Sequence, residues 1–144
     1  MPTVKEVRRD TIELSDGTVW KRVDEEKEFT EVWRLHDQLI IRWDHAKKKY
    51  LLQDIIDGRR RSLVDLIRPS HIRIVAIDKD TLTLSNGSTF AYTHFIKTLH
   101  HGEHILMSLN ENEKRAHYPY FIVGYSHEFG KWVEAGEVQA HLLH

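Results

Sequence analysis

The string HHGEH at residues 100–104 holds the residue types that could most directly perform chemistry. His100, Glu103 and His104 fit the pattern H-x-x-E-H, in which two histidines bind zinc and the glutamate acts as a base in peptide hydrolysis. Such a site requires both histidines on one face of a continuous helix, so that their ring nitrogens meet at the metal. Whether this chemistry is available depends on the secondary structure that carries the motif.

An internal repeat provides a second copy of the surrounding sequence for comparison. Residues 10–17 are DTIELSDG and residues 80–87 are DTLTLSNG, which match at a constant offset of 70. The match resumes at an offset of 66, where residues 33–44 (WRLHDQLIIRWD) align with residues 99–110 (LHHGEHILMSLN). The shorter offset indicates a shorter surface connection in the second copy, a common place for deletions.

The repeat argues against a zinc peptidase. The stretch equivalent to HHGEH is RLHDQ at residues 34–38, which contains no pair of histidines. Both stretches lead directly into an apolar segment that is typical of a strand. Gly102, in the middle of the motif, also disfavours helix. We therefore predict that HHGEH forms a loop and not the zinc site of a peptidase, which leaves simpler metal binding by the histidines open.

Each copy carries the signals of short β-strands joined by tight turns. Residues 11–14 (TIEL) alternate apolar and polar side chains, as a half-buried strand does. Asp16 and Gly17 follow in the first copy, and Asn86 and Gly87 in the second. These pairs are strong hairpin signals, because both central residues of such a turn need positive φ. A hairpin is therefore expected at the start of each copy.

Further strands are predicted over residues 39–43, 50–56 and 61–67, separated by polar turns. Five or six short strands in about 65 residues are typical of a small barrel or sandwich. The predicted fold class is all-β, with two tandem duplicated small β-barrels of an SH3-like or similar type. They cover residues 1–69 and 70–144, with Pro69 at the boundary.

Two segments depart from the strand pattern. Residues 62–65 (SLVD) resemble the start of a helix that Pro69 would stop. Near the C-terminus, Ala135, Val138 and Leu142 have helical spacing, which predicts a short helix over residues 134–143.

The composition and the motifs bound the function. The chain has 144 residues and no cysteine, which removes disulfides, thiol nucleophiles and thiolate metal ligands. No nucleophile elbow, phosphate loop or dinucleotide fingerprint occurs, so no catalytic residue and no cofactor is predicted. The N-terminus lacks the apolar region of a signal peptide, and no apolar run approaches the roughly 20 residues that span a membrane. We expect a cytoplasmic protein that is not an enzyme and does not contact membranes.

Two basic triplets are the candidates for nucleic-acid binding. The net charge of the whole chain is −1, which provides no general attraction to phosphate. A small barrel is nevertheless a common nucleic-acid scaffold, and the triplets could contact phosphates if a groove ran along the strand between them. The alternative is a solvated surface that protects turns and strand edges from aggregation. The six residues are Lys47, Lys48, Lys49, Arg59, Arg60 and Arg61.

The tryptophans could form a stacking surface for bases or peptides, but the repeat favours a core role. Three of them fall opposite other apolar residues of the second copy, which a core contact tolerates and a stacking contact does not. Trp132 has no equivalent and is left unassigned. The three pairs are Trp20 with Phe90, Trp33 with Leu99, and Trp43 with Leu109.

Histidines are concentrated in the second copy. Residues 71–144 contain nine of the eleven, against a background charge of −2, so full protonation would bring this half to +7. Most of that change falls within about one pH unit of 6.5. A pH- or metal-responsive module is therefore a further alternative.

Taken together, the sequence favours a non-enzymatic protein-binding or scaffold module built from the duplicated barrel. Its partner would be another protein or a second copy of the chain, since small barrels expose edge strands that add further strands or dimerise. Nucleic-acid binding through the basic first copy is the second reading.

Overall fold

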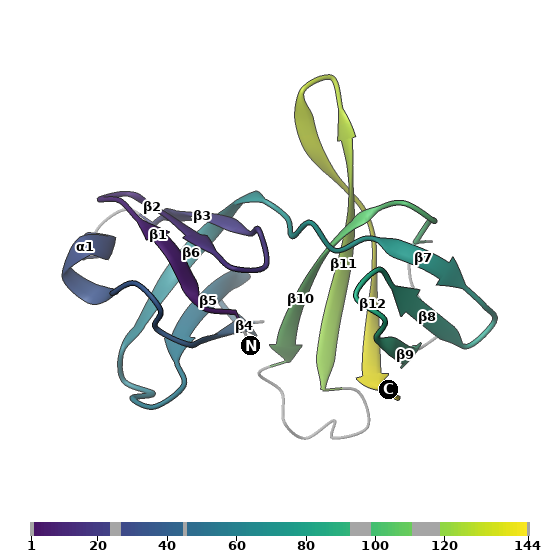
Figure 1. The fold of residues 1–144 in the computed structure, drawn as a ribbon, viewed down its shortest axis with the longest axis horizontal. Coiled ribbons are helices and arrows are strands. Elements are labelled where there is room, and N and C mark those ends of the chain that lie inside the picture. Colours follow the sequence, from purple (N-terminus) through teal and green to yellow (C-terminus); the bar gives the residue numbers. More distant parts are fainter. Residues whose placement is uncertain (1, 24–26, 45, 93–98, 111–118, 144) are drawn as a thin grey trace. The chain divides into compact units, whose positions relative to one another are not determined.

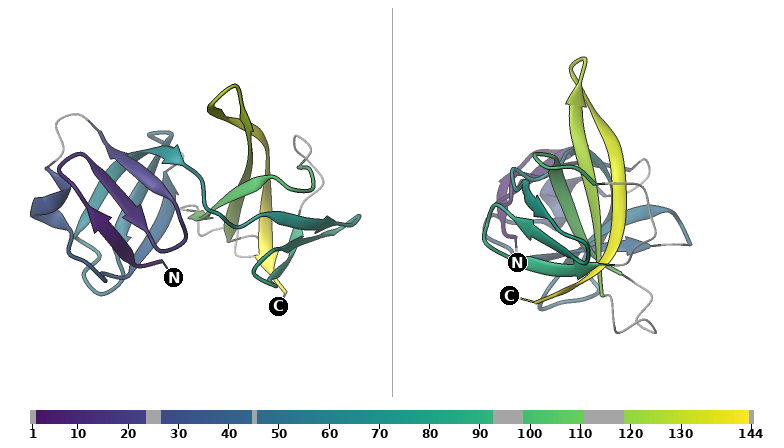
Figure 2. Two further views of the ribbon diagram at one scale, coloured as in Figure 1. Left: turned by 45° about the horizontal axis from the view of Figure 1, so that its top comes forward. Right: turned by 90° about the vertical axis from the view of Figure 1, so that its right-hand side faces the viewer.

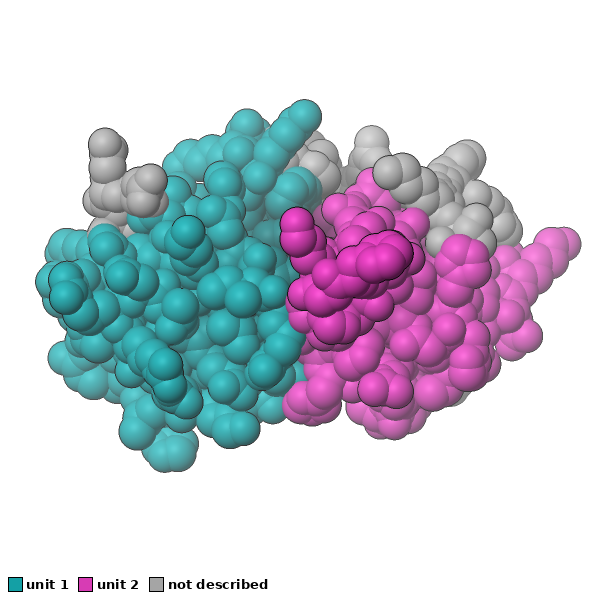
Figure 3. Space-filling view, turned by 90° about the horizontal axis from the view of Figure 1, so that it is seen from above, with its two compact units in different colours: residues 1–68 teal, residues 69–144 magenta. Residues whose placement is uncertain are grey.

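A computed structural model describes residues 2–23, 27–44, 46–92, 99–110 and 119–143 (Figure 1). The structure is all-β, with 60% strand and 3% helix. The chain divides into two compact units, Met1–Arg68 and Pro69–His144, which Figure 3 shows in different colours. Within the described part of the chain, no helix has the length and apolar character needed to cross a membrane.

Unit 1 is an antiparallel sheet of six strands in the order β1-β2-β3-β6-β5-β4. One short helix, α1 (Phe29–Val32), lies in the connection between β3 and β4. The strands are β1 (Val4–Val7), β2 (Thr11–Leu14), β3 (Val19–Arg22), β4 (Leu39–Asp44), β5 (Lys49–Asp54) and β6 (Arg61–Arg68).

Unit 2 has the same strand order, counted from its own first strand: β7-β8-β9-β12-β11-β10. All its neighbouring strands are antiparallel. The strands are β7 (Ile74–Ile77), β8 (Thr81–Leu84), β9 (Thr89–Tyr92), β10 (His104–Asn110), β11 (Tyr120–Glu128) and β12 (Lys131–Leu142).

In the first hairpin turn of each unit the glycine has the predicted positive φ, whereas Asp16 and Asn86 do not. Gly17 has φ of 90° and Gly87 has φ of 89°, so the expectation of positive φ at both is confirmed. The preceding side chain stabilises each turn in the same way. The Oδ1 atom of Asp16 accepts hydrogen bonds from Thr18, and that of Asn86 accepts them from Ser88.

In both units an isolated bridge connects the residue before the first strand to the start of the fourth. The bridges pair Thr3 with Gln38 in unit 1 and Arg73 with His104 in unit 2. Next to them, Val4 donates a backbone hydrogen bond of 2.9 Å to the carbonyl of Asp37. The bridged positions are related by the sequence offsets of 70 and 66.

Both predicted departures from strand are wrong. Residues 62–65 lie in β6, and residues 134–142 lie in β12, which pairs with β11 over residues 131–140 and with β9 over residues 140–142. The buried positions in β12 are Gly136, Val138 and Ala140, which have the period of two that a strand requires. Pairing with β11 along most of β12 and with β9 at its end overrides the helical spacing, because the ladder hydrogen bonds require an extended backbone.

The buried residues confirm two of the three tryptophan assignments. Trp20 is fully buried and Trp33 is 1% exposed. Trp43 is only half-buried and packs against Tyr50 with ring centroids 4.7 Å apart, so its assignment to the core is wrong.

The Trp33 position also differs chemically between the units. In unit 1 the indole Nε1 of Trp33 donates to the hydroxyl of Ser62, at 3.2 Å. Unit 2 has Leu99 at this repeat position, and Val138 pairs with Ile122 as Ser62 pairs with Leu52. The buried indole N–H of Trp33 needs a hydrogen-bond acceptor, which Ser62 provides in unit 1. Leu99 needs none, and in unit 2 the equivalent residue is Val138, which belongs to the same apolar core as Leu99.

Candidate protein-interaction surfaces

HHGEH forms a turn at the entrance to β10, which confirms the loop prediction. Gly102 has φ of 87°, and His36 at the equivalent position of unit 1 has φ of 71°. The Glu103 carboxylate accepts the backbone N–H of His100 at 2.7 Å and thereby caps this turn. His104 points elsewhere, with its Nδ1 atom 2.9 Å from the carbonyl of Ser70.

Metal ligands do not gather in the described part of the chain. No group of three or more His, Asp or Glu side chains that could hold an ion occurs there. His94 and His117 lie outside the described residues. His100 contacts Glu103 through Nδ1 at 3.4 Å, so the two histidines of the motif contact different groups.

The basic triplets lie at two turns on opposite ends of β5. Lys47 and Lys48 are exposed in the turn before it, and Arg61 is exposed at the start of β6. The other three form ion pairs: Lys49 with Asp65, Arg59 with Asp57, and Arg60 with Asp37 and Asp54. Half of the six candidate residues therefore have a carboxylate partner, although the pairs of Lys49 and Arg59 are exposed.

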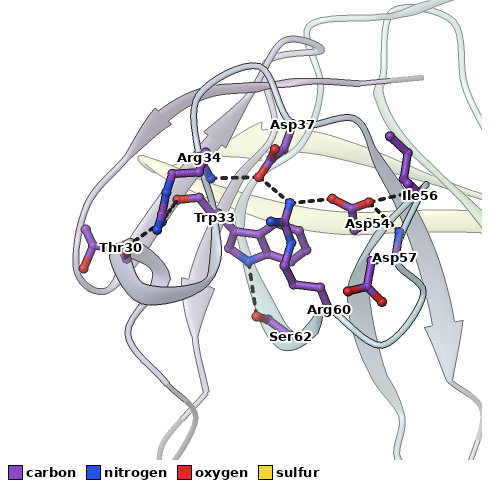
Figure 4. A network of polar contacts seen from close by, with 9 residues as sticks. All are labelled: Thr30, Trp33, Arg34, Asp37, Asp54, Ile56, Asp57, Arg60 and Ser62. Atoms are coloured by element: carbon purple, nitrogen blue, oxygen red, sulfur yellow. Dashed lines mark hydrogen bonds and ion pairs between the residues drawn. The ribbon is translucent and has the colours of Figure 1, made fainter.

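Arg60 is the centre of a polar network in unit 1 (Figure 4). Its guanidinium Nη2 contacts Asp37 at 2.6 Å and also contacts Asp54. The guanidinium carbon lies 5.2 Å from the centroid of the Trp33 ring, within range of a cation–π contact. Trp33 in turn donates to Ser62. This network connects the start of β4 to the β5–β6 turn and holds the Trp33 ring in place.

Asp54 is kept ionised by its surroundings. The backbone N–H groups of Asp57 and Ile56 donate to its Oδ1 atom at 2.9 and 2.7 Å. These hydrogen bonds, with that to Asp57 largest, and the charge of Arg60 lower the pKa of Asp54 despite its burial.

A pH-dependent loss of stability follows for Asp54→Asn. The folded pKa lies below the ordinary value of about 3.8, so the carboxylate contributes stability above that value and loses it as the pH falls through the folded pKa. We expect the variant to be less stable than the wild type at about pH 6 and the difference to narrow below about pH 4. Urea unfolding of the wild type and the variant at about pH 6 and below about pH 4 measures this difference in the free energy of unfolding.

Asp65→Asn is the matched control for that experiment, because it removes the same charge from an exposed pair with Lys49. Exposed pairs contribute little, so its effect should be small at both pH values. A difference for Asp54→Asn that is the same at both pH values would contradict the assigned role of its charge.

Beside this network, unit 1 has an open groove of about 580 Å³ between β1 and α1. We refer to it as the β1–α1 groove. Leu35 is 58% exposed on its wall, whereas Trp33 is buried and forms its floor. The lining residues are Lys5, Glu6, Val7, Thr30, Trp33, Arg34 and Leu35.

Arg34 is oriented at the groove by backbone contacts. Its Nη1 atom donates to the carbonyls of Thr30 at 3.2 Å and Trp33 at 3.3 Å. Its own backbone N–H donates to Asp37 of the polar network. Among the described residues no carboxylate pairs with the guanidinium of Arg34. Because the guanidinium has five donors, it can still bind an acidic group from outside.

In unit 2 the β11–β12 hairpin is longer than its counterpart and projects from the other strands of the unit (Figures 1 and 2). Leu52 and Ser62 face each other in unit 1 with nine residues between them. Ile122 and Val138 are the equivalent pair in unit 2, with fifteen between them. The extension begins at a bulge after Gly124.

The hairpin tip, defined here as Glu128–Lys131, is a two-residue turn between paired strand ends. Phe129 has φ of 50° and Gly130 has φ of 77°, while Glu128 and Lys131 are cross-strand partners. Phe129 is 103% exposed. His36 and Lys48 are the other described non-glycine residues with positive φ, so Phe129 is the only apolar one among them.

Trp132, which the sequence left unassigned, stabilises the projecting part of this hairpin. It is half-buried, faces His127 across the strands and lies against that ring at 4.7 Å and against His104 at 4.9 Å. Ring pairs of this kind contribute about 0.5–1.5 kcal/mol each beyond burial. The hairpin therefore presents its tip on a stabilised stem.

Neither the hairpin tip nor the groove was among the sites predicted from the sequence. The signal for the tip was Phe-Gly between two β-prone runs, where an asparagine is the usual first residue. The groove had no local signal, because β1 and α1 are brought together by the fold. Comparisons with protein-family models, with curated protein sequences and with solved structures gave no match.

Proposed function

We propose that this protein is a non-enzymatic protein-binding module whose principal contact residue is Phe129. The observation that carries the proposal is a fully exposed phenylalanine in a left-handed turn at the tip of a projecting hairpin. Burial in a partner accounts for this arrangement better than any role in the core of unit 2.

Phe129 has two free-energy costs in the unbound protein. A left-handed conformation costs an L-residue other than glycine roughly 1–2 kcal/mol. The exposed ring also forgoes about 1.5–3 kcal/mol that its burial would provide. Asparagine would lower the first cost and remove the second, so a contact outside the chain explains the choice of phenylalanine. Aromatic side chains that insert into pockets are among the residues that contribute most to interfaces.

The scaffold that presents the tip is, in this proposal, a duplicated six-stranded barrel. The common strand order, the equivalent bridges from Thr3 to Gln38 and from Arg73 to His104, and the sequence repeat support this. A barrel of this kind would leave few free strand edges, so binding would depend on specific projections and grooves more than on strand addition.

Photocrosslinking from position 129 tests the proposal. A benzophenone amino acid in place of Phe129 keeps an aromatic ring at the tip. Irradiation of a cell extract that contains the labelled protein should produce protein adducts of defined mass. An unlabelled excess of Leu35→Asp, added before irradiation, should suppress them, because this variant keeps the tip and has an altered groove. The same excess of the double variant Leu35→Asp/Phe129→Asn should not.

The matched control places the same crosslinker at Asn86, which lies at another exposed hairpin turn of unit 2. Adducts specific to position 129 support the proposal. Equal labelling from positions 86 and 129, or labelling that the double variant suppresses as well as Leu35→Asp does, would contradict it.

A further inference from the structure

We infer that the partner of the hairpin tip is the β1–α1 groove of a second copy of this chain. This rests on the proposed function, since it identifies the partner for the same contact residue. The tip belongs to unit 2 and the groove to unit 1, so every copy carries one of each.

The size and the apolar surface of the groove suit the tip. A volume of about 580 Å³ lies within the range of roughly 300–1,000 Å³ that binding sites occupy. Leu35 on the wall, Trp33 on the floor and the half-buried Val7 provide apolar contacts for a phenyl ring. The groove is open along one side, so the residues that flank Phe129 in the turn can enter with it.

The charges at the two surfaces are complementary. Glu128 and Lys131 flank the turn that holds Phe129, and the side chain of neither forms an ion pair with another described residue. At the groove, Arg34 has donors available, and Glu6 is exposed with only a surface pair to Arg8. Glu128 would therefore meet Arg34, and Lys131 would meet Glu6. Carboxylate–guanidinium contacts of this kind add orientation to the apolar contact.

The contact is heterologous, because two different surfaces meet. Such contacts produce rings or open chains instead of a closed symmetric dimer. A hairpin tip covers less than the area of a standard interface, so we expect weak association, with a Kd on the order of 10–100 µM. Assembly would then depend on local concentration, as suits a scaffold.

Two one-sided variants test the inference. Phe129→Asn removes the ring and places the preferred asparagine in the turn, so it should fold with a melting temperature at or above that of the wild type. Leu35→Asp places a charge on the groove wall at a residue that is 58% exposed and therefore tolerant. Sedimentation velocity from about 10 to 500 µM, a range that spans the expected Kd, measures the mass.

The wild type should increase in mass beyond a dimer over this range. Each variant alone should stay monomeric up to about 500 µM, which requires a Kd of about 5 mM or more and hence association at least about fifty-fold weaker. An equal mixture should form a 1:1 dimer and nothing larger, because only the Leu35→Asp copy retains a tip and only the Phe129→Asn copy retains a groove. Arg34→Glu combined with Glu128→Arg in one chain should restore at least part of the association that either change alone removes.

A wild type that remains monomeric at about 500 µM, or variants that do not complement each other, would overturn the inference. A dimer that Leu35→Asp does not affect would overturn it as well. The proposed function fails separately, when position 129 gives no specific protein adduct. Adducts with other proteins but not with this chain would retain the proposed function and exclude the second copy as the partner.

Discussion

Replacing Trp33 with alanine should lower the free energy of unfolding of unit 1 by about 3–5 kcal/mol. The ring is 1% exposed, donates to Ser62, and supports the guanidinium of Arg60. Alanine would leave a cavity, an unsatisfied hydroxyl, and a less constrained arginine. Hydrogen exchange of the amides in β1–β6 measures the loss for unit 1 by itself.

Trp132→Ala is the control, since Trp132 is half-buried on the hairpin of unit 2. This substitution should leave the hydrogen exchange of the amides in unit 1 unchanged. The pair found in unit 2 provides a sharper comparison. Trp33→Leu together with Ser62→Val should cost less than the sum of the single changes, because both lost partners are replaced by apolar groups. A loss below about 1 kcal/mol for Trp33→Ala would contradict its placement in the core.

Gly124→Ala should destabilise unit 2 by about 1–3 kcal/mol, because the site is already filled. An added Cβ would lie 2.7 Å from Cδ2 of Leu99 and 2.9 Å from Oε1 of Glu103. Leu99 is 7% exposed and Glu103 caps the turn before β10, so neither can move away freely. Chemical denaturation measures the loss of stability, and hydrogen exchange of the amides in β10 and β11 assigns it to unit 2.

Gly58→Ala is the matched control in unit 1. Its Cβ would approach only the side-chain amide of Gln53, at 3.1 Å, and it should cost well under about 1 kcal/mol. Leu99→Ala would make room at Gly124, so the double variant should be less destabilised than the sum of the two single variants. Equal effects of Gly124→Ala and Gly58→Ala would contradict the close packing around Gly124.

Local signals were sufficient for several parts of this protein. Gly17 and Gly87 adopt positive φ as their turn pairs predict, and the β4–β5 hairpin forms where alternation and a polar turn indicate it. HHGEH is a turn, as its repeat equivalent predicts. These features depend on a few consecutive residues, because turn conformation and side-chain alternation are properties of the local backbone.

Other features required partners that are distant in the sequence. The residues of β12 have helical spacing locally but form a strand, because β9 and β11 are positioned to pair with it. Arg60 belongs by sequence to a basic triplet, yet it binds Asp37, 23 residues away. Neither the pairing of β12 nor the contact between Arg60 and Asp37 can be predicted from neighbouring residues in the sequence, because both depend on how the strands align.

The two surfaces proposed for binding also combine features that are visible in the local sequence with features that depend on the fold. The phenylalanine and glycine at the hairpin tip are visible in the sequence, but the exposure of Phe129 follows from how far β11 and β12 extend past the rest of unit 2. The β1–α1 groove exists because the Arg60 network holds Trp33 and orients Arg34 opposite β1. The sequence alone determined the strands and their turns, whereas tertiary pairing decided which side chains remained available for a partner, because exposure depends on what the rest of the fold covers.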